Sequence, residues 1–169
     1  MVDAWRGPTN GPSTATTNYK WMDSINPYVK SEQVFNCPSQ TFASPWGAYK
    51  FRSGTNYGSY CISAAYYAGN DAYEGAAYSA LAAIEAPATT VLATDGAGNF
   101  ETQWPSPAGN PSIVNGPPRT LEQTVERHMD TTVVLYCDGH VKSVKLDALA
   151  RTKTIGSDQV MTAFTISDD

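Results

Sequence analysis

The sequence predicts an α+β fold in which an N-terminal helix packs on an antiparallel β-sheet, with long irregular loops between the strands. Three observations indicate this class. Apolar residues at helical spacing come first in the chain, and runs rich in β-branched and aromatic residues follow them. Two of these runs are joined by Asp138-Gly139, which is a strong hairpin-turn signal. We therefore expect one sheet covered by one helix.

The predicted helix starts at Tyr19, and Pro27 either breaks it or starts a second turn. Thr17 or Asn18 can cap its N-terminus, because a side-chain oxygen there can accept an unpaired backbone N–H. Apolar residues then recur three and four positions apart and form one inward face: Met22, Ile25 and Val29. Pro38 ends the helical region, since the residue before a proline is driven out of helical geometry.

Strand-like runs follow the helix, each bounded by turn residues. They cover residues 60–67, 89–94, 131–137, 140–144 and 161–166. Shorter helical segments are predicted at 76–85, 121–126 and 146–151. Residues 40–58 place aromatic side chains between glycines, which predicts short strands and tight turns. The stretch from Ala97 to Pro118 carries five prolines and is predicted to be a long irregular loop.

Length and composition limit the functions to consider. The 169 residues fit a single domain, predicted over residues 18–169 after an N-terminal arm of residues 1–17. The net charge is −5 and no cluster of Lys and Arg is present, so we expect no nucleic-acid partner. Ten Tyr and four Trp exclude a disordered acidic chain. A surface poor in charge and rich in Tyr, Asn and Thr indicates an extracellular or cell-surface setting.

The most specific motif is His128, followed after nine residues by Asp138-Gly139. Other segments accompany it in a fixed order: Cys37-Pro38-Ser39, Tyr57-Gly58-Ser59-Tyr60, and a strand that ends at Asp95-Gly96. Together these segments resemble bacterial type IV pilin-like and pseudopilin-like proteins, which carry a C-terminal motif of His, nine residues and Asp-Gly. The resemblance extends from about residue 18 to about residue 146.

The resemblance implies a non-enzymatic structural subunit of an extracellular filament or a type II secretion pseudopilus, held in the inner membrane before assembly. Such proteins begin with a basic leader and an apolar helix of about 20 residues, which this sequence does not contain. We therefore expect the chain to be a soluble headpiece whose arm, residues 1–17, follows the missing helix. Its partners would be identical or other pilin-like subunits, and its only membrane contact would be through that helix.

Two other functions stay open. A secreted module for carbohydrate or surface polymer would use the 97–118 loop, with Trp104 as the exposed contact. A hydrolase would use Asp95 and Asp138 as a carboxylate pair. The chain has only two histidines and no Gly-x-Ser-x-Gly segment, so we expect no enzymatic activity and no cofactor.

The motif residues also raise a question of metal binding. Asp95 and Asp138 each end a predicted strand, and their oxygens would suit Ca²⁺, whereas His128 would favour a transition metal. The structural alternative is that His128 bonds the Asp138 carboxylate and fixes the end of the sheet. Cys37 and Cys61 are candidates for a disulfide, and the alternative is that all three cysteines are buried thiols.

Overall fold

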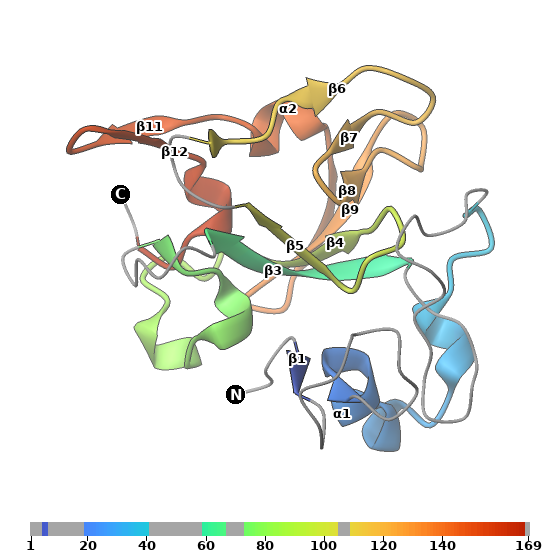
Figure 1. Ribbon diagram of the computed structural model, residues 1–169. Coiled ribbons are helices and arrows are strands. Elements are labelled where there is room, and N and C mark those ends of the chain that lie inside the picture. Colours follow the sequence, from blue (N-terminus) through green and yellow to red (C-terminus); the bar gives the residue numbers. More distant parts are fainter. Residues whose placement is uncertain (1–4, 7–18, 41–58, 67–72, 105–108, 168–169) are drawn as a thin grey trace.

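A five-stranded mixed sheet forms the centre of the computed structural model, which describes residues 5–6, 19–40, 59–66, 73–104 and 109–167 (Figure 1). The strand order is β10-β9-β4-β3-β5, with β5 parallel to β3 and every other pair antiparallel. The strands are β3 (Tyr60–Tyr66), β4 (Val91–Asp95), β5 (Glu101–Trp104), β9 (Thr132–Tyr136) and β10 (Val141–Val144).

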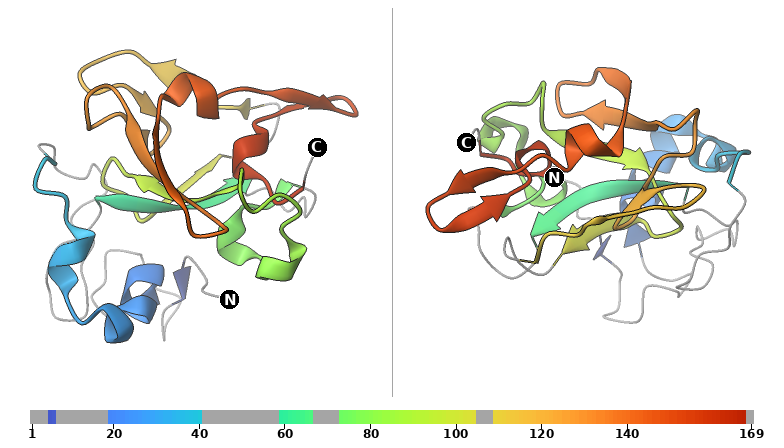
Figure 2. Two further views of the ribbon diagram at one scale, coloured as in Figure 1. Left: turned by 180° about the vertical axis from the view of Figure 1, so that it is seen from behind. Right: turned by 90° about the horizontal axis from the view of Figure 1, so that it is seen from above.

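Smaller elements surround this sheet. The additional strands are β1 (Trp5–Arg6), β2 (Tyr19–Lys20), β6 (Ile113–Val114), β7 (Thr120–Leu121), β8 (Thr124–Val125), β11 (Lys153–Ile155) and β12 (Asp158–Val160). The helices are α1 (Trp21–Val29) and α2 (Leu146–Leu149), and the 3-10 turns are η1 (Glu32–Phe35), η3 (Ala76–Tyr78), η4 (Leu81–Ala83) and η6 (Thr162–Phe164). Segments α1, η3 and η4 lie on one side of the sheet, and α2 and β6–β8 lie on the other (Figure 2).

The predicted α+β class is wrong, because the described part of the chain is mostly β-structure and its central sheet is mixed. The predicted helix is present as α1, but only its first turn contributes buried apolar side chains, from Trp21 and Met22. Val29, expected on the inward face, is 40% exposed. A nine-residue helix that is buried only at one end does not form a layer of its own.

The predictions for single elements had different outcomes. The strands predicted within residues 60–67, 89–94, 131–137 and 140–144 are confirmed as β3, β4, β9 and β10. The helix predicted at 76–85 is instead two 3-10 turns, η3 and η4, and the strand predicted at 161–166 contains the turn η6. The helical segment predicted at 121–126 is the β7–β8 hairpin, where Glu122 has a φ of 51°. The arm at 1–17 and the turns at 40–58 lie almost wholly outside the described residues.

The main hydrophobic core lies between the sheet and the α2 side of the molecule. Side chains of β9 alternate, so Val134 and Tyr136 enter this core while Val133 and Leu135 face the opposite side. Trp104 lies in the same core, 3% exposed, with its ring 5.1 Å from those of Tyr66 and Phe164 in edge-to-face contacts. The prediction that Trp104 is an exposed contact is therefore wrong: it ends strand β5, inside the stretch predicted to be a loop.

Replacement of Trp104 by Ala should lower the free energy of unfolding by about 3–5 kcal/mol, because it leaves a large cavity in the core. Urea denaturation followed by circular dichroism measures the change. Val114→Ala is the control, since Val114 is 61% exposed and its truncation should cost less than about 0.5 kcal/mol. A Trp104→Ala protein as stable as the control variant would contradict the buried position of this side chain.

Candidate functional site

Residues from several of the sequence motifs meet at one end of the central sheet, although Asp138-Gly139 is not among them. His128 lies in the loop between β8 and β9, with its Nε2 3.5 Å from Cys37 Sγ and 3.8 Å from Asp95 Oδ1. Arg127 places its NH1 3.5 Å from the same Asp95 oxygen and donates a hydrogen bond to the carbonyl of Ser59. We call these five residues the motif cluster. Most of these residues are far apart in the sequence. For example, 91 positions separate Cys37 from His128, so only the folded chain brings the two side chains together.

A tight turn at the start of β9 positions His128. The backbones of His128 and Thr131 exchange two hydrogen bonds of 3.1 Å. The residues between them, Met129 and Asp130, have φ values of 51° and 55°, which is the conformation of a type I′ hairpin turn. Neither residue is glycine, so this backbone is strained. The turn holds the His128 side chain over the cluster with 39% of its surface exposed.

Asp95 is the acid of the motif cluster, and only 1% of its side chain is exposed. Burial raises the pKa of this carboxyl, while the Val133 N–H bond, Arg127 and His128 each act to lower it. One carboxylate oxygen accepts the Val133 N–H at 2.8 Å, and the other faces Arg127. Because Arg127 also bonds the carbonyls of Ser59 and Gly96, the pair ties together the starts of β3 and β9 and the end of β4.

Asp138 lies elsewhere. Strands β4 and β9 are antiparallel, so the strand ends that carry Asp95 and Asp138 point in opposite directions. Val91, four residues before Asp95, pairs with Tyr136, two residues before Asp138, so the two aspartates are separated by more than about 13 Å of strand at about 3.3 Å per residue. They therefore form neither the predicted carboxylate pair nor, with His128, a shared metal site. Within the described residues, no group of three His, Cys, Asp or Glu side chains is arranged to hold a metal ion.

Asp138 is bonded within its own hairpin. Its carboxylate accepts the backbone N–H of His140 at 3.1 Å and lies 2.6 Å from His140 Nδ1, and these contacts, the backbone bond first, lower the pKa of Asp138. Gly139 has a φ of 94°, as the predicted turn requires. His140, and not His128, is thus the partner of Asp138. The sequence motif suggested a bond across nine residues, whereas the real bond spans two.

The three cysteines are free thiols, so the predicted Cys37–Cys61 disulfide is not formed. Cys61 Sγ lies 3.2 Å from Thr94 Oγ1, and burial raises the pKa of this thiol to about 12. Cys37 contacts His128, but the same ring nitrogen also faces Asp95. A Cys-His-Asp relay needs the thiol and the carboxylate on different ring nitrogens. The cluster therefore lacks the geometry of a nucleophilic triad.

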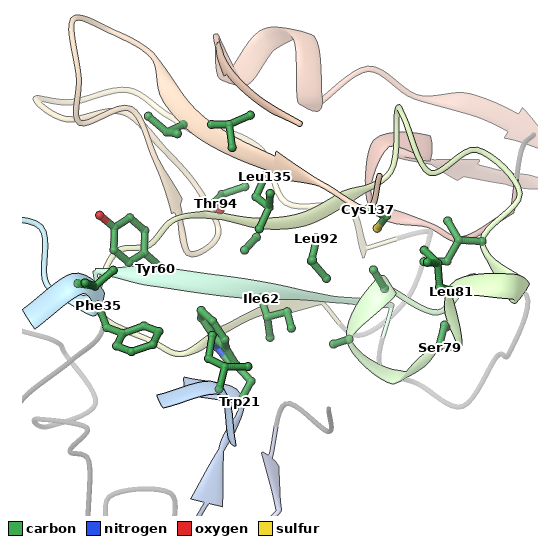
Figure 3. Close-up of a pocket in the computed structure, with 18 residues that line it drawn as sticks. Trp21, Phe35, Tyr60, Ile62, Ser79, Leu81, Leu92, Thr94, Leu135 and Cys137 are labelled. Atoms are coloured by element: carbon green, nitrogen blue, oxygen red, sulfur yellow. The ribbon is translucent and has the colours of Figure 1, made fainter. Parts of the chain in front are cut away.

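The face of the sheet turned away from the main core carries an apolar groove of about 670 Å³ (Figure 3). Its floor comes from strands β3, β4 and β9 through Ile62, Leu92 and Leu135. One wall is formed by α1 and η1, and the other by η3 and η4. None of the described residues that line it is charged: Trp21, Ile25, Val34, Phe35, Tyr60, Ile62, Ala76, Ala77, Ser79, Leu81, Ile84, Leu92, Ala93, Thr94, Val133, Leu135, Cys137 and Val141.

The groove keeps large apolar side chains in water. Leu81 is 65% exposed, Val141 is 61% exposed and Val34 is 59% exposed, and all three line it. A contiguous apolar surface of this kind marks an interaction site in most proteins. The groove was not predicted from the sequence. Apolar residues at Val133, Leu135 and Cys137, between residues that face the core, nevertheless indicate a strand with two apolar faces.

Comparisons with protein-family models, with curated proteins and with solved structures find no match. The motif cluster and the groove are therefore the features of the protein that bear on its function. None of the described helices is long and apolar enough to cross a membrane.

Arg127→Met should lower the stability of the protein by about 3–5 kcal/mol near neutral pH, because it leaves the Asp95 carboxylate buried without its cation. The pKa of Asp95 then rises further, so ionised Asp95 destabilises the fold above that pKa. Below the unfolded value, about 3.9, the carboxyl is protonated in both states and this cost vanishes. The deficit relative to the wild type should therefore shrink as the pH falls from about 7 toward about 4.

Denaturation midpoints in urea at several pH values measure this dependence. Arg151→Met is the control, because Arg151 is exposed and its loss should have a small effect at every pH. A constant deficit across this pH range would show that Arg127 acts through packing rather than through the Asp95 charge.

The free thiols can be counted directly. When protein purified without reductant is unfolded in guanidinium, three thiols per chain should react with Ellman's reagent, since Cys37, Cys61 and Cys137 are unpaired. In the folded state at mild pH the reaction should be slow, because burial raises the pKa of Cys61 to about 12 and that of Cys137 to about 11. A single equivalent after unfolding would instead indicate a disulfide.

Proposed function

We propose that the protein is a non-enzymatic structural subunit of a type IV pilin-like or pseudopilin-like assembly outside the cell. The apolar groove carries this proposal. A groove of about 670 Å³ with no charge on the described residues that line it has the surface of a packing site. The described lining residues include a few polar side chains, such as Tyr60, Ser79 and Thr94, but no charged group that would orient a small substrate.

The position of the groove defines what it accepts. It lies on the face of the sheet, where the backbone groups of β3, β4 and β9 are already paired with neighbouring strands. A partner placed on this face, and not at a sheet edge, must satisfy its own backbone bonds. A helix with an apolar stripe meets this condition, whereas an added strand would need a sheet edge. We infer that an apolar helix, the kind that pilin-like subunits supply, covers the groove.

The motif cluster fits a structural role in the same assembly. Phe35 and Val34 form part of one groove wall, and Cys37 lies two residues after Phe35 in the chain. The Cys37 N–H bonds Ser59 Oγ at 2.7 Å, and its sulfur contacts His128. The cluster therefore fixes the α1–η1 wall to the sheet and keeps the groove open at its proper width.

The proposed location follows from the proposed assembly: the subunit is held in the inner membrane by an apolar helix before assembly and is exposed outside the cell afterwards. The competing proposals lose their residues. Carbohydrate binding through Trp104 is not supported, because that side chain is buried. Hydrolysis by Asp95 and Asp138 is not supported, because the two residues lie at opposite ends of neighbouring strands.

A charge introduced into the groove tests the proposal. Val141 lines the groove and Val114 does not, yet both are 61% exposed, so Val141→Glu and Val114→Glu are a matched pair. Both variants should fold, as judged by circular dichroism. In cells that express the whole gene product, Val141→Glu should reduce the amount of protein in sheared surface filaments at least about tenfold, because a buried unpaired carboxylate is costly. Val114→Glu should leave that amount unchanged.

Equal incorporation of the two variants would argue against the groove as the assembly surface. Absence of even the wild-type protein from any surface or pseudopilus fraction would argue against a filament subunit altogether.

A further inference from the structure

A second hollow lies on the opposite face of the same strand pair. The groove takes odd-numbered residues of β9 and β10, including Val133 and Val141, whereas Tyr136 and Lys142 point to the other side. There, together with α2, η6 and the 86–90 turn, they enclose a hollow of about 310 Å³. This volume is at the low end for small-molecule sites, about 300–1,000 Å³, and suits one ring rather than a long chain.

The hollow contains a lysine, Lys142, in a chain whose net charge is −5. Lys142 and His140 line it, and among its described lining residues there is no carboxylate. The segment 142–153 holds four of the chain's 11 basic residues and a single acid, Asp147, which is paired with Arg119 at 2.9 Å. Lys142 can therefore offer its ammonium group to an anionic ligand in the hollow.

The remaining lining favours a hydroxylated ring over a simple ion. The His140 ring stacks on Tyr136 with centroids 4.4 Å apart and planes 11° from parallel. Asp138, 2.6 Å from His140 Nδ1, fixes that ring in place. Four Ser and Thr side chains also line the hollow: Thr89, Thr90, Thr162 and Ser167. Hydroxyls can exchange hydrogen bonds with sugar hydroxyls, and the Lys142 ammonium can bond a carboxylate.

We propose that this hollow binds a carboxylate-bearing sugar unit of an acidic polysaccharide, with Lys142 on the carboxylate and the Tyr136–His140 stack beside the ring. The site is independent of the proposed assembly surface, because the two lie on opposite faces of β9 and β10. A subunit whose groove is filled can therefore still present it. In the proposed filament the site would repeat on every subunit, so that weak contacts to a polymer add up.

The test is a nuclear magnetic resonance titration of the whole 169-residue chain with digalacturonic acid, its neutral methyl ester and inorganic phosphate. The acid should shift the amides of Thr89, His140, Lys142 and Ala148, which surround the hollow. Lys142→Ala should weaken that binding at least about tenfold, since a charge-assisted hydrogen bond is lost. Lys153→Ala removes the same charge outside the lining and should change the affinity less than about twofold.

The three ligands separate the outcomes. Binding of the acid alone, weakened by Lys142→Ala, supports the proposal. Equal binding of the methyl ester would remove the role given to Lys142, and equal binding of phosphate would reduce the hollow to a general anion site. Absence of shifts at the four amides would overturn the proposal. Lys142 is exposed, so the variant should fold, and an unchanged amide spectrum away from the hollow verifies this.

Discussion

The buried pair of Asp95 and Arg127 is the interaction on which the rest of the structure depends. A carboxylate with 1% of its surface exposed and a guanidinium with 3% are both costly to remove from water. They are retained where three strands must be held in one register: Asp95 ends β4 and bonds the backbone of Val133 in β9, and Arg127 bonds the backbone beside β3. Such directional bonds specify an arrangement that apolar packing alone leaves free.

Two apolar layers depend on that arrangement. The strands held by the pair put alternate side chains into the main core and into the groove, so that both faces of the sheet carry apolar side chains. The contact between Cys37 and His128 extends the same cluster to the α1–η1 wall. In the proposed assembly, the partner that covers this apolar face also removes it from water.

Four of the five strands of the central sheet and the Asp138-Gly139 turn could be predicted from the sequence, because alternation and turn residues are local signals. The sequence did not predict that β5 runs parallel to β3 or that Trp104 is buried, because these depend on partners distant in the chain. Of the motif residues, Cys37, Ser59, Asp95 and His128 meet in the fold, whereas Asp138 does not. His128 faces Asp95 rather than Asp138, because the antiparallel order of β4 and β9 places the two aspartates at opposite ends. The groove depends on which face remains uncovered, which no local pattern encodes.

The two-residue alternation of β9 has a consequence for how this protein can change. Odd positions such as Val133 and Leu135 belong to the groove, and even positions such as Val134 and Tyr136 belong to the core and the second hollow. Substitutions at odd positions can therefore alter the partner without disturbing the interior, and two surfaces can diversify separately on one strand. Insertions have the opposite effect, because a single added residue would exchange the two sets at once. We therefore expect variation in this strand to occur by replacement and never by a change in length.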